Sequence, residues 1–189
     1  SIFAIIDIYF VSKLGNEAVS SVGLTESLMT IVYAIGVGLS MATTGLIARR
    51  IGEDRDHDAS VAAVQAIITG IFISFIIAVP GLLFAKEILS LMNADPGVVE
   101  SGSAYTSIMM GGNVFIMLLF VNNAIFRSAG SPAIAMRVLV LANLINIILD
   151  PILIFGLGPI PAMGVKGAAM ATNIGRGIGV FYQIFLLTN

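Results

Sequence analysis

Long stretches without a charged residue alternate with short polar clusters along this sequence. Residues 27–48, 59–85 and 101–126 contain no Asp, Glu, Lys or Arg, and residues 138–165 contain only Asp150. Each stretch exceeds the roughly 20 residues that a helix needs to cross a bilayer core of about 30 Å. Because lipid offers no water to backbone N–H and C=O groups, these stretches predict membrane-spanning helices.

The pattern predicts six spanning helices, over about residues 1–12, 24–50, 59–84, 98–127, 132–155 and 164–189. The sequence begins in an apolar stretch without an initiator Met and ends in another, so we expect the first and last helices to be truncated. The charged cluster at residues 53–58 is the clearest predicted loop. We therefore predict one all-α integral membrane unit over residues 1–189, a six-helix transmembrane bundle.

Composition agrees with a membrane protein and excludes several functions. Hydrophobic residues make up 58% of the chain and charged residues 11%, whereas soluble domains carry roughly a quarter charged residues. A net charge of −2 leaves no broad basic face for nucleic acid. The sequence has no cysteine, and it shows no catalytic triad, metal-ligand spacing or phosphate-binding loop. We therefore expect neither an enzyme nor a protein that needs a cofactor.

Arginine and lysine at the predicted helix ends indicate an orientation. Five arginines follow the second and fourth helices, whereas single lysines follow the first, third and fifth: Arg49, Arg50, Arg55, Arg127 and Arg137 against Lys13, Lys86 and Lys166. The positive-inside rule places the arginine-rich ends in the cytoplasm. We expect a multi-pass protein of the plasma (inner) membrane, in contact with lipid.

Two carboxylates, Asp7 and Asp150, interrupt the apolar stretches. Intramembrane carboxylates are costly and usually functional. Asn146 lies four residues before Asp150 on the same helical face, and Pro151 follows it. Proline removes a helix hydrogen bond, so we expect a kink that frees the Ile147 carbonyl and creates a polar pocket at membrane depth. The alternative is that both carboxylates sit in water near helix ends.

Polar residues on other predicted helices could join these carboxylates. Asn122 and Asn123 lie on the fourth helix, and Thr172 and Asn173 on the sixth. Each alone is best explained by a hydrogen bond between helices. Together with the carboxylates, their oxygens could hold a hard cation such as Na⁺, or the carboxylates could share a proton.

Several segments resemble, in order, the amino-terminal half of transporters of the multidrug and toxic compound extrusion (MATE) family. They are Asp7 followed by SKLGNEAVSSVGL, then GVGLSMATTGLIARRIG, NNAIFRSAG with PAIAMR, NIILDPILIFG and MGVKGAAMATNIG. The resemblance implies one lobe of a two-lobed, twelve-helix transporter, whose partner is the carboxyl-terminal lobe of the same parent protein. It also implies efflux of lipophilic or cationic xenobiotics in exchange for H⁺ or Na⁺ by alternating access. The cation site that it implies consists of Asp7, Asn123, Asn146, Asp150 and Thr172.

Two other functions remain open from the sequence. A lipid-linked oligosaccharide flippase of the same superfamily would share the six-helix lobe, but it should line its cavity with several basic residues to meet pyrophosphate. Only Arg176, in the sixth predicted helix, could serve in this way. A channel or a non-transporting scaffold gives no reason for the Asp7, Asn146 and Asp150 set.

Overall fold

The computed structural model describes residues 2–188, and the side chains of residue 6 and residues 8–188. Within these residues the chain forms eight helices and no strand. They are α1 (Ile2–Ser12), α2 (Asn16–Gly52), α3 (Asp56–Leu83), α4 (Ala85–Leu91), α5 (Pro96–Gly111), α6 (Asn113–Ser128), α7 (Ala133–Phe155) and α8 (Val165–Thr188). The prediction of an all-α fold is confirmed.

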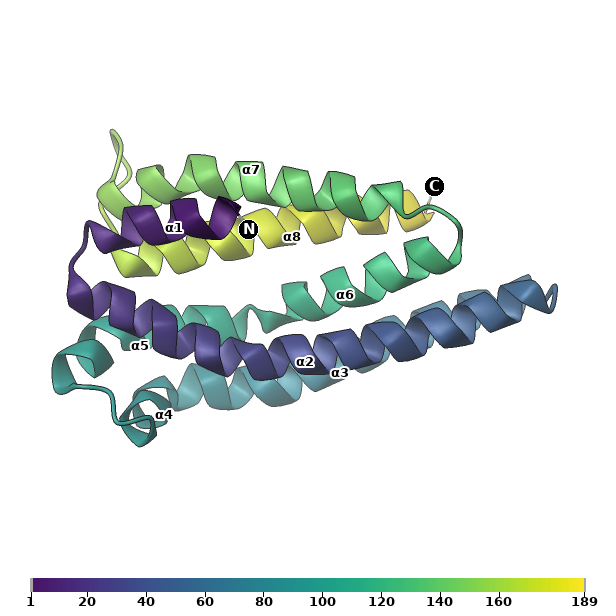
Figure 1. Cartoon of the computed structure of the whole chain (residues 1–189), viewed down its shortest axis with the longest axis horizontal. Coiled ribbons are helices and arrows are strands. Elements are labelled where there is room, and N and C mark those ends of the chain that lie inside the picture. The colour runs from purple at the N-terminus through teal and green to yellow at the C-terminus, as the bar shows by residue number, and fades with distance from the viewer. Residues whose placement is uncertain (1, 189) are drawn as a thin grey trace.

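The helices run roughly parallel to the long axis of the molecule in two groups (Figure 1). α7 packs along α8, with α1 beside both, and α2 packs against α3, α5 and α6. α5 and α6 also contact α8, so they join the two groups. With α5 and α6 counted as one crossing and α4 as a short connection, the chain forms one six-helix transmembrane lobe.

Four helical segments of the described chain are long and apolar enough to cross a membrane: Asn16–Gly52, Asp56–Leu83, Pro96–Ser128 and Ala133–Phe155. The segment Pro96–Ser128 comprises α5 and α6. α1, with 11 described residues, and α8, which carries several polar side chains, are not among the four. Large apolar side chains such as Phe72, Phe75 and Phe181 are more than 60% exposed, which suits a surface that contacts lipid.

The second helix begins at Asn16, eight residues before its predicted start at 24. The predicted span starts beyond the polar residues at the beginning of this segment, but a helix can continue past the bilayer with its charges in water. Gly15 makes the turn between α1 and α2 with φ 105°, a conformation that L side chains rarely adopt. Both helices can therefore end close to this turn.

The fourth predicted helix is broken at Gly112 into α5 and α6. Asn113 Nδ2 donates hydrogen bonds to the Met110 carbonyl (2.6 Å) and to the Ser74 carbonyl of α3 (3.0 Å), which fixes the break. A Cβ atom at Gly112 would overlap the Asn173 side chain of α8. The break and the short α4 were not predicted, because both depend on contacts between helices.

Charged side chains gather where α2 meets α3, but the connection is shorter than the loop predicted for residues 53–58: it comprises residues 53–55, and residues 56–58 form the first turn of α3. Glu53 Oε1 accepts a hydrogen bond from Arg49 Nε at 2.8 Å, and Glu53 Oε2 pairs with Arg55 Nη1 at 3.2 Å. The Arg49 guanidinium, and after it that of Arg55, holds the pKa of the Glu53 carboxyl below its ordinary value. These pairs are exposed to solvent, so they contribute little to stability.

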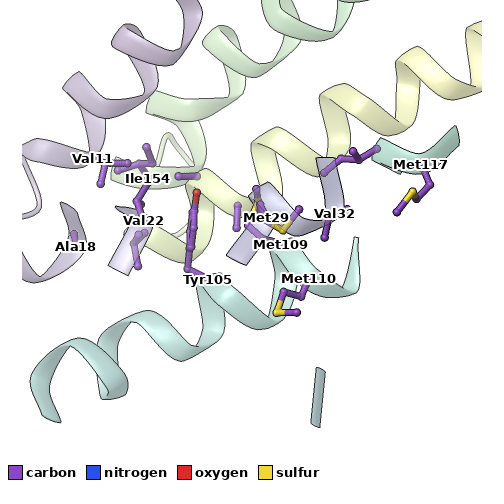
Figure 2. Packing of buried hydrophobic residues seen from close by; sticks show 14 residues of the cluster. Val11, Ala18, Val22, Met29, Val32, Tyr105, Met109, Met110, Met117 and Ile154 are labelled. Carbon is purple, nitrogen blue, oxygen red and sulfur yellow. The ribbon is translucent and has the colours of Figure 1, made fainter. Parts of the chain in front are cut away.

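The hydrophobic core lies between the two groups of helices. Figure 2 shows Tyr105 of α5 reaching toward Ile154 of α7 and Val22 of α2, with Met29 and Met109 packed further along the same interface. Tyr105, Met29 and Met109 are at most 1% exposed. The same cluster includes Val165, Ala168 and Ala169 of α8, so the core joins α2, α5, α7 and α8.

α7 continues from Ala133 to Phe155 through Pro151. Pro151 therefore lies inside the helix and does not end it, and the predicted kink stays a prediction. The following turn carries Gly156 at φ 81°, where a Cβ atom would approach the Ile160 carbonyl and the Ala162 nitrogen. Glycine is required here because the chain must fold back to start α8 beside α7.

Candidate functional site

Three predicted site residues meet where α7 contacts α8. Asn146 Nδ2 donates to Asp150 Oδ1 at 3.2 Å and to Thr172 Oγ1 at 3.2 Å. The Asp150 side chain is fully buried, at 0% exposure. We call Asn146, Asp150 and Thr172 the Asp150 cluster.

Helical geometry and close packing bring the Asp150 cluster together. Asn146 and Asp150 share a face of α7 because they are four residues apart. Thr172 reaches them because α8 approaches α7 closely at two glycines. A Cβ atom at Gly167 would overlap the Leu153 carbonyl, and one at Gly175 would lie 2.6 Å from the Ala142 carbonyl oxygen. Backbone therefore lies against backbone on both sides of Thr172.

The Asp150 cluster offers one carboxylate, one amide and one hydroxyl. Oxygen donors of this kind suit a hard cation such as Na⁺, and a buried carboxylate can equally take a proton. Among the described side chains, no three His, Asp or Glu residues form a metal site. Any cation bound here by the described residues would therefore rely on the single carboxylate of Asp150 together with neutral oxygens.

Asp7 lies in α1, and its side chain is outside the described residues. The α1 backbone contacts both α7 and α8 (Figure 1), which places the helix that carries Asp7 next to the two helices of the Asp150 cluster. A role for Asp7 in the site stays a prediction.

Asn123 takes part in a different set of contacts. Its Oδ1 accepts a hydrogen bond from Gln183 Nε2 of α8 at 2.7 Å, and Gln183 Oε1 accepts one from Asn122 Nδ2 at 3.2 Å. Gln183 lies eleven residues after Thr172, which corresponds to about 16 Å along α8. The structure therefore places Asn123 in a separate cluster, the amide cluster of Asn122, Asn123 and Gln183.

Sequence reasoning missed Gln183, although the signal was present. It is a single amide in the apolar segment GVFYQIFLL of α8, and it is fully buried where α8 faces α6. Asn173, in contrast, points away from the Asp150 cluster and donates to the Ile108 carbonyl of α5 at 2.8 Å. Successive residues of a helix project about 100° apart, so Thr172 and Asn173 face different neighbours.

We expect Gln183→Leu to lower the free energy of unfolding by about 1–2 kcal/mol, because two buried amides lose their partner. Thermal unfolding of the detergent-solubilised full-length parent protein measures this change. The exposed Thr188→Val variant is the control. If Gln183→Leu leaves stability unchanged but alters the ion that drives transport, the amide cluster belongs to the ion site and the structural interpretation is wrong.

Arg176 brings a positive charge from α8 into the lobe. Arg176 lies one turn after Thr172, and its Nη2 donates to the Tyr33 hydroxyl of α2 at 3.3 Å. Both side chains are half-buried. Arg176 is the interior basic residue expected from the sequence, and its partner Tyr33 depends on how α8 packs against α2.

Comparison with known proteins gives the family of this fold. The MatE family model matches residues 1–152. An FAD transporter of Shewanella oneidensis is 31% identical over 170 residues, which are 90% of this chain and 38% of that protein. The multidrug export protein MepA of Staphylococcus haemolyticus is 32% identical over 186 residues, which are 97% of this chain and 40% of that protein.

Solved structures agree with this assignment. An outward-facing multidrug resistance MATE family transporter of the MOP superfamily superimposes with a TM-score of 0.89, and an inward-facing one with 0.90. Both are 31% identical, and the matches cover 98% of this chain and 40% and 41% of the solved chains. The chain thus spans about 40% of the length of the relatives that it matches. Since the family model covers most of the chain and the fold agrees, this protein belongs to the MatE family of membrane transporters.

Proposed function

We propose that the chain is the amino-terminal lobe of a secondary active exporter, which moves lipophilic or cationic compounds outward in exchange for H⁺ or Na⁺. The observation that carries this proposal is the fully buried Asp150 carboxylate, which accepts a hydrogen bond from Asn146. The same Asn146 amide also donates to Thr172 of α8, so it links the carboxylate to the neighbouring helix. Among the alternatives raised by the sequence, a scaffold would have no need for this costly group.

The physical basis of exchange is competition for one negative charge. An ionised Asp150 in a low-dielectric interior attracts a cation strongly, because water screens it poorly. A proton or Na⁺ that binds there removes this attraction, so a cationic substrate dissociates. In this proposal Asp7 supplies a second carboxylate, and the two would titrate as a coupled pair. The resemblance also assigns Asn123 to the site, although its hydrogen bond to Gln183 favours a structural role.

Alternating access would come from movement of this lobe against a second one. The chain superimposes equally well on outward-facing and inward-facing relatives, with TM-scores of 0.89 and 0.90. This agreement supports a lobe that moves largely as a rigid body. The second lobe would be the carboxyl-terminal part of the same parent protein, and the substrate would pass between the two lobes unchanged, without a cofactor. The arginine-rich connections α2–α3 and α6–α7 would face the cytoplasm of a cell whose plasma membrane holds the protein.

The test is efflux from vesicles that contain the full-length parent protein. Vesicles loaded with a fluorescent lipophilic cation are given an H⁺ gradient or an Na⁺ gradient separately. We expect one gradient to drive efflux, and that gradient identifies the coupling ion. Efflux that ignores both gradients would contradict the proposal, and movement of a lipid-linked pyrophosphate without either gradient would support a flippase.

A further inference from the structure

Arg176 presents an unused hydrogen-bond donor inside the lobe. Its Nη1 atom is buried and has no hydrogen-bond partner within the described part of the chain, while Nη2 donates to Tyr33. The five ion pairs found among the described side chains all lie at the α2–α3 connection, and none includes Arg176. A guanidinium at membrane depth is expensive without a counter-charge. Its presence therefore indicates a partner that the described residues do not supply.

Tyr33 adds a second donor beside the first. A hydroxyl carries one proton and two acceptor positions. Because the Tyr33 oxygen accepts the hydrogen bond from Arg176, its own proton is directed to another acceptor. Nη1 and Nη2 belong to one planar group, and Tyr33 lies against Nη2, so an oxyanion that meets this guanidinium would find the Tyr33 O–H as a candidate second donor. Two donors from two helices, one of them charged, fit a carboxylate or phosphate better than a neutral ligand.

The surroundings allow access to this pair. Arg176 and Tyr33 are both only half-buried, so part of each side chain is exposed, although the Nη1 atom itself is buried. Arg176 also lies one turn along α8 from Thr172, which hydrogen-bonds to Asn146 of the Asp150 cluster. α8 therefore carries a positive group one turn from a cluster that contains a buried carboxylate.

We infer that Arg176 and Tyr33 bind the carboxylate or phosphate of an organic solute inside the lobe. This inference rests on the proposed transport function and narrows its substrate class: acidic and zwitterionic lipophilic compounds bind at Arg176, while a cationic group is drawn to the Asp150 cluster. The chemistry of the anion is shared by carboxylate drugs and by lipid phosphates, and the experiment separates these sources.

The test uses a rhodamine dye with a free carboxylate and the methyl ester of the same dye. Binding of each to the purified full-length parent is measured by fluorescence polarisation, which does not require transport. We expect Arg176→Gln to weaken binding of the acid by about tenfold or more, since a hydrogen bond to a charged group is lost, and to change binding of the ester less than about twofold. Tyr33→Phe should weaken binding of the acid by about threefold to tenfold.

The exposed Arg137→Gln variant is the matched control, and thermal unfolding checks that each variant is folded. Equal weakening of acid and ester by Arg176→Gln would overturn the inference, as would an unchanged affinity for the acid. A loss of thermal stability without loss of acid selectivity would assign Arg176 to an ion pair within the parent protein and would also overturn it.

If anionic phosphatidylglycerol competes with the acid dye in wild type but not in Arg176→Gln, the site is confirmed and the natural oxyanion is a lipid phosphate. Because binding is read directly, absence of efflux would count against the proposed function alone.

Discussion

Asp150→Asn is expected to remove nearly all gradient-driven efflux by the full-length parent while the protein stays folded. The substitution keeps the shape of the side chain, and its amide oxygen can still accept the hydrogen bond from Asn146 that Asp150 Oδ1 accepts at 3.2 Å. It removes the negative charge for which, in the proposed mechanism, substrate and coupling ion compete. Loss of one member of a buried charge pair costs about 2–5 kcal/mol, so we expect efflux to fall by about a hundredfold. The measurement is efflux of a fluorescent cation under an imposed H⁺ or Na⁺ gradient.

The matched control is Asp54→Asn, which makes the same chemical change at an exposed position between α2 and α3. Asp54 has φ 56°, and asparagine tolerates this conformation well, so the control should fold and transport like wild type. If Asp150→Asn transports as well as wild type, Asp150 is a structural residue and the exchange mechanism proposed for this lobe is wrong.

The parts of the site that follow from helical periodicity could be predicted from the sequence. Asn146 and Asp150 are on one helix, so their spacing of four already places them on one face. Thr172 was a candidate from its place in the sixth predicted helix, but only the family resemblance chose it over Asn173, because its distance from Asn146 depends on how closely α8 approaches α7. That approach depends in turn on Gly167 and Gly175, whose role is visible only once the Leu153 and Ala142 carbonyls are placed opposite them.

The partner of Asn123 could not be predicted for a similar reason. The register of α6 against α8 decides whether Asn123 faces Asp150 or Gln183, and a sequence fixes periodicity along one helix but not register between two helices. The break at Gly112 has the same origin, since it depends on the hydrogen bond from Asn113 to Ser74 of α3. The spanning stretches themselves were predictable because the bilayer imposes its length on each helix separately.

Gly175→Ala and Gly177→Ala are expected to have different effects on stability, although the two residues are only two positions apart on α8. A Cβ atom at Gly175 would lie 2.6 Å from the Ala142 carbonyl oxygen, so α7 and α8 must separate. A Cβ atom at Gly177 would meet the Phe115 ring at 3.4 Å, an ordinary contact. We expect Gly175→Ala to lower the free energy of unfolding by about 1–3 kcal/mol through overpacking. Gly177→Ala should be neutral, or stabilising by up to about 1 kcal/mol, through the better helix propensity of alanine.

Thermal unfolding of the two full-length variants measures this difference, and efflux tests its connection with function. Separation of α7 from α8 lengthens the Asn146–Thr172 hydrogen bond, so Gly175→Ala should lose transport even at temperatures where it is fully folded. Gly177→Ala leaves that contact in place and should transport normally. If both variants unfold at the same temperature and transport equally, the close approach of α7 and α8 at Gly175 does not hold the Asp150 cluster together. The other close approach, at Gly167, would then have to keep Thr172 against Asn146. Gly167→Ala tests this, because its Cβ atom would overlap the Leu153 carbonyl.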